Sequence, residues 1–215
     1  MMNIKQVARL LNDIDRPMII TQTTLEPDVD YGENYYMLKL NTENAKWEFL
    51  FMQRERQNSG GENLIKSFED EAEAIKYYYL FQLHSYFFKH YVHPFQFNNK
   101  DINMGRPSFH LVNLKESFRR LNVDPSYYSL DGKVKEHSML LEKVNKEESK
   151  LYFIGQKEKV VNASLAQENW LIYSAMYRSV YYLYLFDQHY ENLLKTKEVG
   201  HIFTDEDYKA ILTGR

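Results

Sequence analysis

The stretch YYMLKLNTENAKWEFLFMQ, residues 35–53, decides the fold, because two apolar runs flank the polar segment NTENAK as in a β-hairpin. About a hundred residues later, MLLEKVNKEESKLYFIGQ at residues 139–156 repeats this layout. The pattern Asn-x-Glu-x-x-Lys occupies residues 41–46 and again 145–150. Aromatic and aliphatic runs on both sides of a polar turn are typical of half-buried antiparallel strands. The sequence therefore predicts two hairpins, with strands at 35–40, 47–53, 139–144 and 151–156.

A short helix is predicted before each hairpin. The segments IKQVARLLN, residues 4–12, and LKESFRRLN, residues 114–122, share Lys-x-x-x-Arg-x-Leu-Asn. Apolar residues recur on one helical face of the first segment, and Asn3 has the position of its N-cap. A proline follows each segment within a few residues and is expected to stop the helix.

A long aromatic helix is predicted after each hairpin, at 69–92 and at 168–194. Capping-box spacings stand near both starts, Ser67 with Asp70 and Ser164 with Gln167. Both helices are apolar around most of their circumference, which predicts a position between layers. The segment TDEDYKAIL, with Thr204 as the cap, predicts a short closing helix.

These matches recur in the same order, which indicates an internal duplication. We expect an α+β fold made of two tandem helix–antiparallel β-hairpin/meander–helix repeats. The repeats are expected at residues 1–105 and 106–215, the second with the short C-terminal helix. They are predicted to pack pseudo-symmetrically through their long aromatic helices.

Composition excludes several classes of protein. The formal net charge is −3, whereas nucleic-acid binders usually carry a strongly basic face, so no nucleic-acid partner is expected. The absence of cysteine excludes disulfides and thiolate chemistry. The run WLIYSAMYRSVYYLYLF, residues 170–186, has Arg178 at its centre, where membrane insertion costs about 2.5–3.5 kcal/mol. A buried helix is therefore preferred to a membrane span, and with no signal-like start the chain is expected to be cytoplasmic.

Few residues have a spacing that points to catalysis. His90-x-x-His93 could ligate a metal, but Pro94 places His93 at a helix end, where capping is the simpler role. An enzymatic alternative would use His84, His90 or the acidic loop described next. Since no nucleophile or phosphate-binding motif is found, we expect neither an enzyme nor a cofactor or metal site.

The segment TTLEPDVDYGEN, residues 23–34, is the strongest candidate for a partner-binding surface. Its carboxylates could form a solvated loop, hint at a divalent cation through Asp28-x-Asp30, or attract a basic partner. Tyrosines beside it could act as anchors, because a phenol has an apolar ring and a polar end. The residues expected to bind a partner are Glu26, Asp28, Asp30, Tyr31, Glu33, Tyr35 and Tyr36.

The run YYMLKLNTENAKWEFLFMQRERQ, followed by FEDEAEAIKYYYLFQL, resembles a layout found among immunity proteins of bacterial polymorphic toxin systems. That layout has an aromatic strand pair, an Arg-Glu or Arg-Gly turn, an acidic segment and a helix that opens with paired aromatic residues. The resemblance covers residues 35–90 and, less closely, 139–190. Glu55 stands where a glycine would follow the arginine.

The resemblance implies a non-enzymatic inhibitor that sits in the cytoplasm and binds a cognate toxin domain. A second class of function stays open, that of a cytoplasmic interaction or scaffold protein, as a homodimer joined through the aromatic helices. An undescribed enzyme is the third class.

Overall fold

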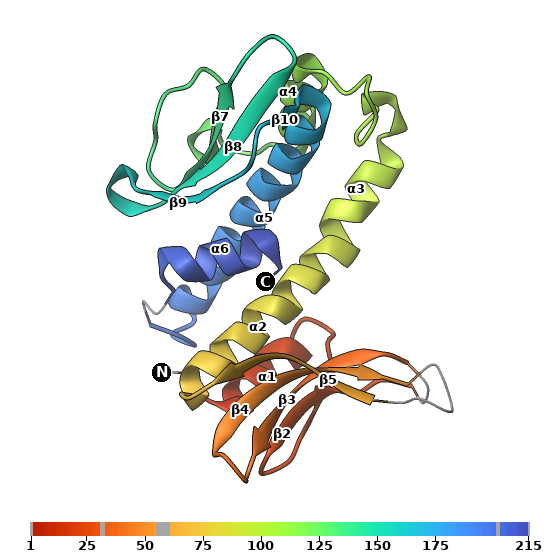
Figure 1. The fold of residues 1–215 in the computed structure, drawn as a ribbon, viewed down its shortest axis with the longest axis vertical. Coiled ribbons are helices and arrows are strands. Elements are labelled where there is room, and N and C mark those ends of the chain that lie inside the picture. The colour runs from red at the N-terminus through yellow and green to blue at the C-terminus, as the bar shows by residue number, and fades with distance from the viewer. Residues whose placement is uncertain (1, 31–32, 55–60, 201–202, 215) are drawn as a thin grey trace. The chain divides into compact units, whose positions relative to one another are not determined.

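The chain divides into two compact units, Met1–Leu83 and His84–Arg215, which are described separately. The computed structural model describes the chain apart from residues 1, 31–32, 55–60, 201–202 and 215 (Figure 1). The protein is α+β, as predicted, with a sheet in each unit. The division at 83/84 places the predicted repeat boundary at 105/106 inside the second unit. Within the described residues, no helix is both long enough and apolar enough to cross a membrane.

The first unit is a five-stranded antiparallel sheet with helices on one face (Figure 1). Its strands follow chain order, each paired with the next. The elements are α1 (Ile4–Asn12), β1 (Met18–Ile20), β2 (Thr24–Pro27), β3 (Tyr35–Asn41), β4 (Lys46–Gln53), β5 (Gly61–Phe68) and α2 (Glu71–Phe87), whose last four residues belong to the second unit.

Aromatic side chains fill the space between the first sheet and α2. The ring of Phe49 on β4, 1% exposed, lies 4.9 Å from that of Phe81 and 5.4 Å from that of Tyr36. Tyr78 is fully buried, and its hydroxyl donates to the Tyr36 carbonyl oxygen at 3.2 Å. The phenol thus satisfies its polar atom inside an apolar core.

The second unit holds a mixed sheet against a long helix. Its strand order is β10-β8-β7-β6, β9 also pairs with β8, and β6 runs parallel to β7. The strands are β6 (Tyr128–Ser129), β7 (Ser138–Lys143), β8 (Glu148–Ile154), β9 (Val160–Ala163) and β10 (Gln167–Glu168). The helices are α3 (His93–Asn98), α4 (Leu111–Leu121), α5 (Asn169–Lys195) and α6 (Asp205–Thr213), and the short turns are η1 (Phe88–Val92), η2 (Lys100–Ile102), η3 (Pro125–Tyr127) and η4 (Gln156–Glu158).

Helix α5 contacts the sheet and the helical segment 84–98 (Figure 1). The Tyr177 hydroxyl donates to the Val92 carbonyl oxygen at 3.0 Å, and the Phe95 ring stacks on Tyr177 at 5.8 Å. Between α2 and α3 the helix widens into the π-helical turn η1. Pro94 follows that turn and has no N–H to continue the α-helical pattern, which accounts for the irregularity.

The predicted elements agree with the structure except at some boundaries. Asn3 caps α1 as predicted, with its Oδ1 accepting from the Gln6 amide at 2.9 Å, and Thr204 caps α6. The predicted caps Ser67 and Ser164 are wrong. Asp70 accepts from the Glu73 amide instead, and the Ser164 hydroxyl accepts from the Leu151 amide of β8. The tandem repeat and its pseudo-symmetry stay predictions.

Candidate partner-binding face

The predicted partner-binding residues lie along β2, β3 and the loop between them. Glu26 is in β2, and Asp28, Asp30 and Glu33 are exposed in the loop. Tyr31 lies outside the described residues. Tyr35 and Tyr36 begin β3 and point to opposite faces of the sheet, because neighbouring residues in a strand alternate.

Tyr36 faces the helices, where its ring lies 4.6 Å from that of Phe81 and 4.9 Å from that of Phe51. Tyr35 therefore faces away from α2, and the strand register shows what accompanies it. Tyr35 pairs with Met52, and Met37 pairs with Leu50. These four residues form one apolar group on the far face of the sheet, which we call the far-face cluster.

The far-face cluster is well packed. Met37, Leu50 and Met52 are 5%, 2% and 7% exposed, and Tyr35 packs against them. Antiparallel sheets with helices on one face usually present polar side chains on the other. The far-face cluster is therefore a second small core, whose two methionines and leucine are already shielded within the chain, and only the side chains around it are exposed.

Two exposed aliphatic side chains lie on the far face at the two edges of the sheet. Leu64 on the edge strand β5 pairs with Leu50 and is 57% exposed. Ile19 on the opposite edge strand β1 pairs with Glu26, so it lies on the far face, and it is 44% exposed. Between Ile19 and the cluster, the far face of β2 carries the polar side chains of Thr24 and Glu26. The exposed apolar groups on the far face are thus Leu64 at one edge and Ile19 at the other.

Charged groups border the far-face cluster. Arg54 donates to the Tyr35 hydroxyl at 3.2 Å, and its guanidinium lies 5.8 Å from the centre of the Tyr35 ring. Burial and the hydrogen-bonded Glu26 carboxylate raise the pKa of Tyr35, while Arg54 opposes them. Lys39 of β3 and Glu62 of β5 form an ion pair at 3.0 Å that reaches across the intervening strand β4.

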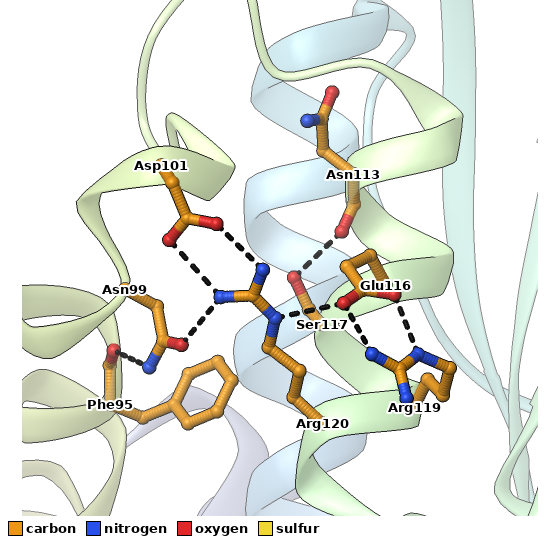
Figure 2. Close-up of polar contacts among 8 residues, drawn as sticks. All are labelled: Phe95, Asn99, Asp101, Asn113, Glu116, Ser117, Arg119 and Arg120. Atoms are coloured by element: carbon orange, nitrogen blue, oxygen red, sulfur yellow. Dashed lines mark hydrogen bonds and ion pairs between the residues drawn. The ribbon is translucent and has the colours of Figure 1, made fainter.

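A second polar cluster joins η2 to α4 and is shown in Figure 2. Arg120 makes a two-pronged contact with Asp101, at 2.6 and 3.0 Å, and also donates to Glu116 at 2.9 Å. Hydrogen bonds from Arg119 and Arg120 lower the pKa of Glu116 to about 2. Since these charges satisfy one another, the cluster fastens a loop to a helix and offers little to a ligand.

A third cluster centres on Asp187 of α5. Its Oδ2 lies 2.8 Å from His137 Nε2, and its Oδ1 accepts from the Tyr208 hydroxyl at 2.8 Å. Burial and the nearby carboxylate raise the pKa of Tyr208. Both carboxylate oxygens are thus engaged, and the contacts connect α5 to α6 and to the residue before β7. Sequence reasoning missed His137 and Asp187, because they are fifty positions apart without a motif.

The histidines considered as metal ligands lie among aromatic rings. His90 is 4.5 Å from the Tyr86 ring, and His93 is 5.8 Å from the Phe88 ring. In the part of the chain that the structure describes, no three His, Asp or Glu side chains are gathered in a way that could hold a metal ion.

Searches for relatives found no matching family model, curated protein or solved structure. What the chain binds is therefore inferred from its own residues.

Proposed function

We propose that the chain is a non-enzymatic immunity protein that binds and neutralises a cognate bacterial toxin domain. Two things support the proposal: the resemblance of residues 35–90 to such proteins and the exposed side chains around the far-face cluster. The observation that carries it is the far side of the sheet, where Leu64 and Ile19 are exposed at the edges and the half-buried Tyr35 stands next to an exposed acidic loop.

The far face offers suitable anchors for a protein partner. Tyr35, at the start of β3, packs its ring against the buried methionine and leucine side chains, and its hydroxyl accepts a hydrogen bond from Arg54. Tyrosine is enriched among the residues that dominate binding energies. Leu64 adds an exposed aliphatic group at the edge.

The acidic side chains beside the face favour a basic partner. Asp28, Asp30 and Glu33 are exposed in the loop that precedes β3, and Glu26 bonds to Tyr35. Like charges grouped beside an apolar centre steer an oppositely charged protein and raise its association rate. A toxin domain with a basic surface fits this arrangement.

The test uses the toxin domain encoded beside the gene for this chain, if one is found there, produced with and without this protein. Growth should be restored when both are present and the purified pair should bind. Leu64→Arg should weaken binding tenfold or more, since burying a leucine is worth about 1.5–3 kcal/mol. Leu165→Arg is the matched control, because Leu165 is 80% exposed and lies in the other unit.

The outcomes separate the proposal from its alternatives. Equal killing by the toxin with and without this protein would end the immunity hypothesis. If Leu64→Arg and Leu165→Arg bind the toxin domain equally well, the far face is not the binding surface. Neutralising the acidic loop, with Asp28→Asn, Asp30→Asn and Glu33→Gln together, should slow association and reduce its dependence on salt.

A homodimer joined through the aromatic helices is the competing hypothesis. The aromatic and aliphatic residues of α5 are largely used within its own unit, where Tyr177, Val180 and Phe186 are at most 1% exposed. A dimer would have to use another surface. Sedimentation of the wild type and of Leu64→Arg distinguishes the cases: a dimer lost in the variant would mean that a second copy covers the far face.

A further inference from the structure

A pocket in the second unit has a lining unlike the far face. It has a volume of about 420 Å³ and lies between the His84–Phe88 segment, α5 and the end of α6. Its lining consists of His84, Phe88, Ala175, Arg178, Ser179, Tyr182, Leu212 and Thr213. No acidic side chain is among these residues. Arg178 is the residue that interrupts the apolar run 170–186.

The α5 side of the pocket follows from helical spacing. Residues 175, 178, 179 and 182 are three or four positions apart, so they share one face of the helix. Ala175 and Ser179 are small and leave a hollow, which Arg178 and Tyr182 flank. The sequence AMYRSVYY thus places a cation beside a depression.

Three hydrogen-bond donors line the pocket without a partner in the described part of the chain. The structure shows no ion pair or hydrogen bond for the Arg178 guanidinium, the Ser179 hydroxyl or the Tyr182 hydroxyl among these residues. No side-chain polar atom there is both fully buried and unbonded, so each donor keeps access to the solvent. Burial raises the pKa of Tyr182 to about 12, with Arg178 opposing the shift, so this phenol keeps its proton.

His84 supplies an aromatic wall. Its Nδ1 lies 2.7 Å from the Ile211 carbonyl oxygen and must carry a proton to donate to it. Its ring stacks on Tyr182 at 4.3 Å with an interplanar angle of 20°. A Cβ on Gly214 would lie 2.9 Å from the imidazole, so the glycine lets the end of α6 approach this ring. Phe88, 42% exposed, lies on the same pocket.

We propose that this pocket binds a small organic anion, a carboxylate or phosphate joined to a planar ring. The guanidinium and the two hydroxyls receive the anionic group, because charge-assisted hydrogen bonds to carboxylate or phosphate are the strong ones. The aromatic side chains receive the ring. This site is independent of the far face, which lies in the other unit.

The experiment compares charged probes with neutral partners of the same shape. The affinity of the protein for adenosine 5′-monophosphate is compared with its affinity for adenosine, and its affinity for benzoate with that for benzamide. Calorimetry or ligand-observed NMR measures each one. The phosphate and carboxylate arms show which anionic group is preferred. At least one charged probe should bind tenfold or more tightly than its neutral partner. Equal binding within both pairs, or binding of none, would overturn the proposal.

Variants assign any binding to the pocket. Arg178→Gln should weaken binding of the charged probe about 10- to 100-fold, as expected for a hydrogen bond between charged groups. Lys195→Gln is the control, since it removes the same charge from an exposed position on the same helix. If Arg178→Gln does not fold, Ser179→Ala should still reduce affinity several-fold. The same affinity in these pocket variants and in the control would place the anion elsewhere and refute the site.

Discussion

The two hairpins that share Asn-x-Glu-x-x-Lys use its first half in the same way. In β3–β4 the Asn41 Oδ1 accepts from the Glu43 amide at 3.0 Å, and in β7–β8 the Asn145 Oδ1 accepts from the Glu147 amide at 2.8 Å. Each asparagine therefore closes a local turn with the backbone two residues ahead. The repeated motif has a physical role in both places.

The two hairpins differ in the register that follows. Asn41 pairs with Lys46, which leaves four residues in the turn. In the second hairpin the Val144 amide donates to the Glu148 carbonyl oxygen at 3.1 Å, which leaves three, and Lys150 pairs with Glu142. Phe49 thus pairs with Leu38, whereas Phe153, its counterpart in the sequence, pairs with Met139.

If the two hairpins are aligned by their matching sequences, the strand pairing of the second is therefore shifted by three positions along its first strand. Three is an odd number. Because side chains alternate between faces, an odd shift reverses which residues of the first strand share a face with the phenylalanine. The first hairpin places Tyr36 and Leu38 with Phe49, and the second places Met139 and Leu141 with Phe153. A motif that fixes a turn does not fix the register of the strands beside it.

The largest effect is expected from removing the matched phenylalanines. Phe49 and Phe153 are each 1% exposed, so Phe49→Ala and Phe153→Ala should each lower the free energy of unfolding by about 3–5 kcal/mol. If the units fold separately, Phe49→Ala should accelerate amide exchange in residues 35–53 but not in 138–154. Phe153→Ala should do the reverse. Faster exchange across both hairpins in either variant would show that the units unfold together.

Much of this architecture could be predicted from the sequence, since the hairpins and long helices have clear patterns. Strand β5 was missed because its first seven residues are exposed and its apolar pair, Leu64 and Ile65, shows no alternation. A bulge between Phe49 and Leu50 in its pairing explains that irregularity.

The candidate sites were less predictable. The run WEFLFM, residues 47–52, is apolar at almost every position, which indicates a strand but not which residues face away from the helices. The far-face cluster thus required the register. In the second unit, Arg178 argued only against a membrane span, because its neighbours in the pocket come from segments distant in sequence.

Acid should distinguish the two units. All seven histidines lie in residues 84–215. Burial lowers the pKa of His189 from 6.5 to about 4 and also lowers that of His84. The unfolded chain therefore binds protons more readily, and the second unit should lose stability as the pH falls from about 6.5 to about 4. His189 alone should account for roughly 3 kcal/mol of this loss.

Amide exchange at a series of pH values, corrected for the intrinsic rate, measures this loss in each unit. His189→Gln should flatten the dependence in residues 138–154, while residues 35–53 should show little change above pH 5 in either protein. If exchange in the first hairpin depended on pH equally strongly, the effect would come from carboxylates, which both units contain.

The smallest effect tests the shared turn itself. Asn145 Oδ1 also accepts from the Glu148 amide at 2.9 Å, so it holds two backbone donors, whereas Asn41 Oδ1 holds one, the Glu43 amide. Asn41→Ala should lower the free energy of unfolding by about 1 kcal/mol, because a lost hydrogen bond costs roughly 1–1.5 kcal/mol and water compensates for part of it. Asn145→Ala should lower it somewhat more, because two backbone donors lose their acceptor.

The controls are Thr42→Ala and Lys146→Ala, which alter the exposed position after each asparagine and should change stability by less than about 0.5 kcal/mol. Chemical denaturation of all four variants measures the differences. A larger cost for Asn145→Ala would mean that the tighter, three-residue turn depends on its asparagine to hold the shifted register. Equal costs would mean that the second amide bond contributes nothing and that strand pairing alone sets the register.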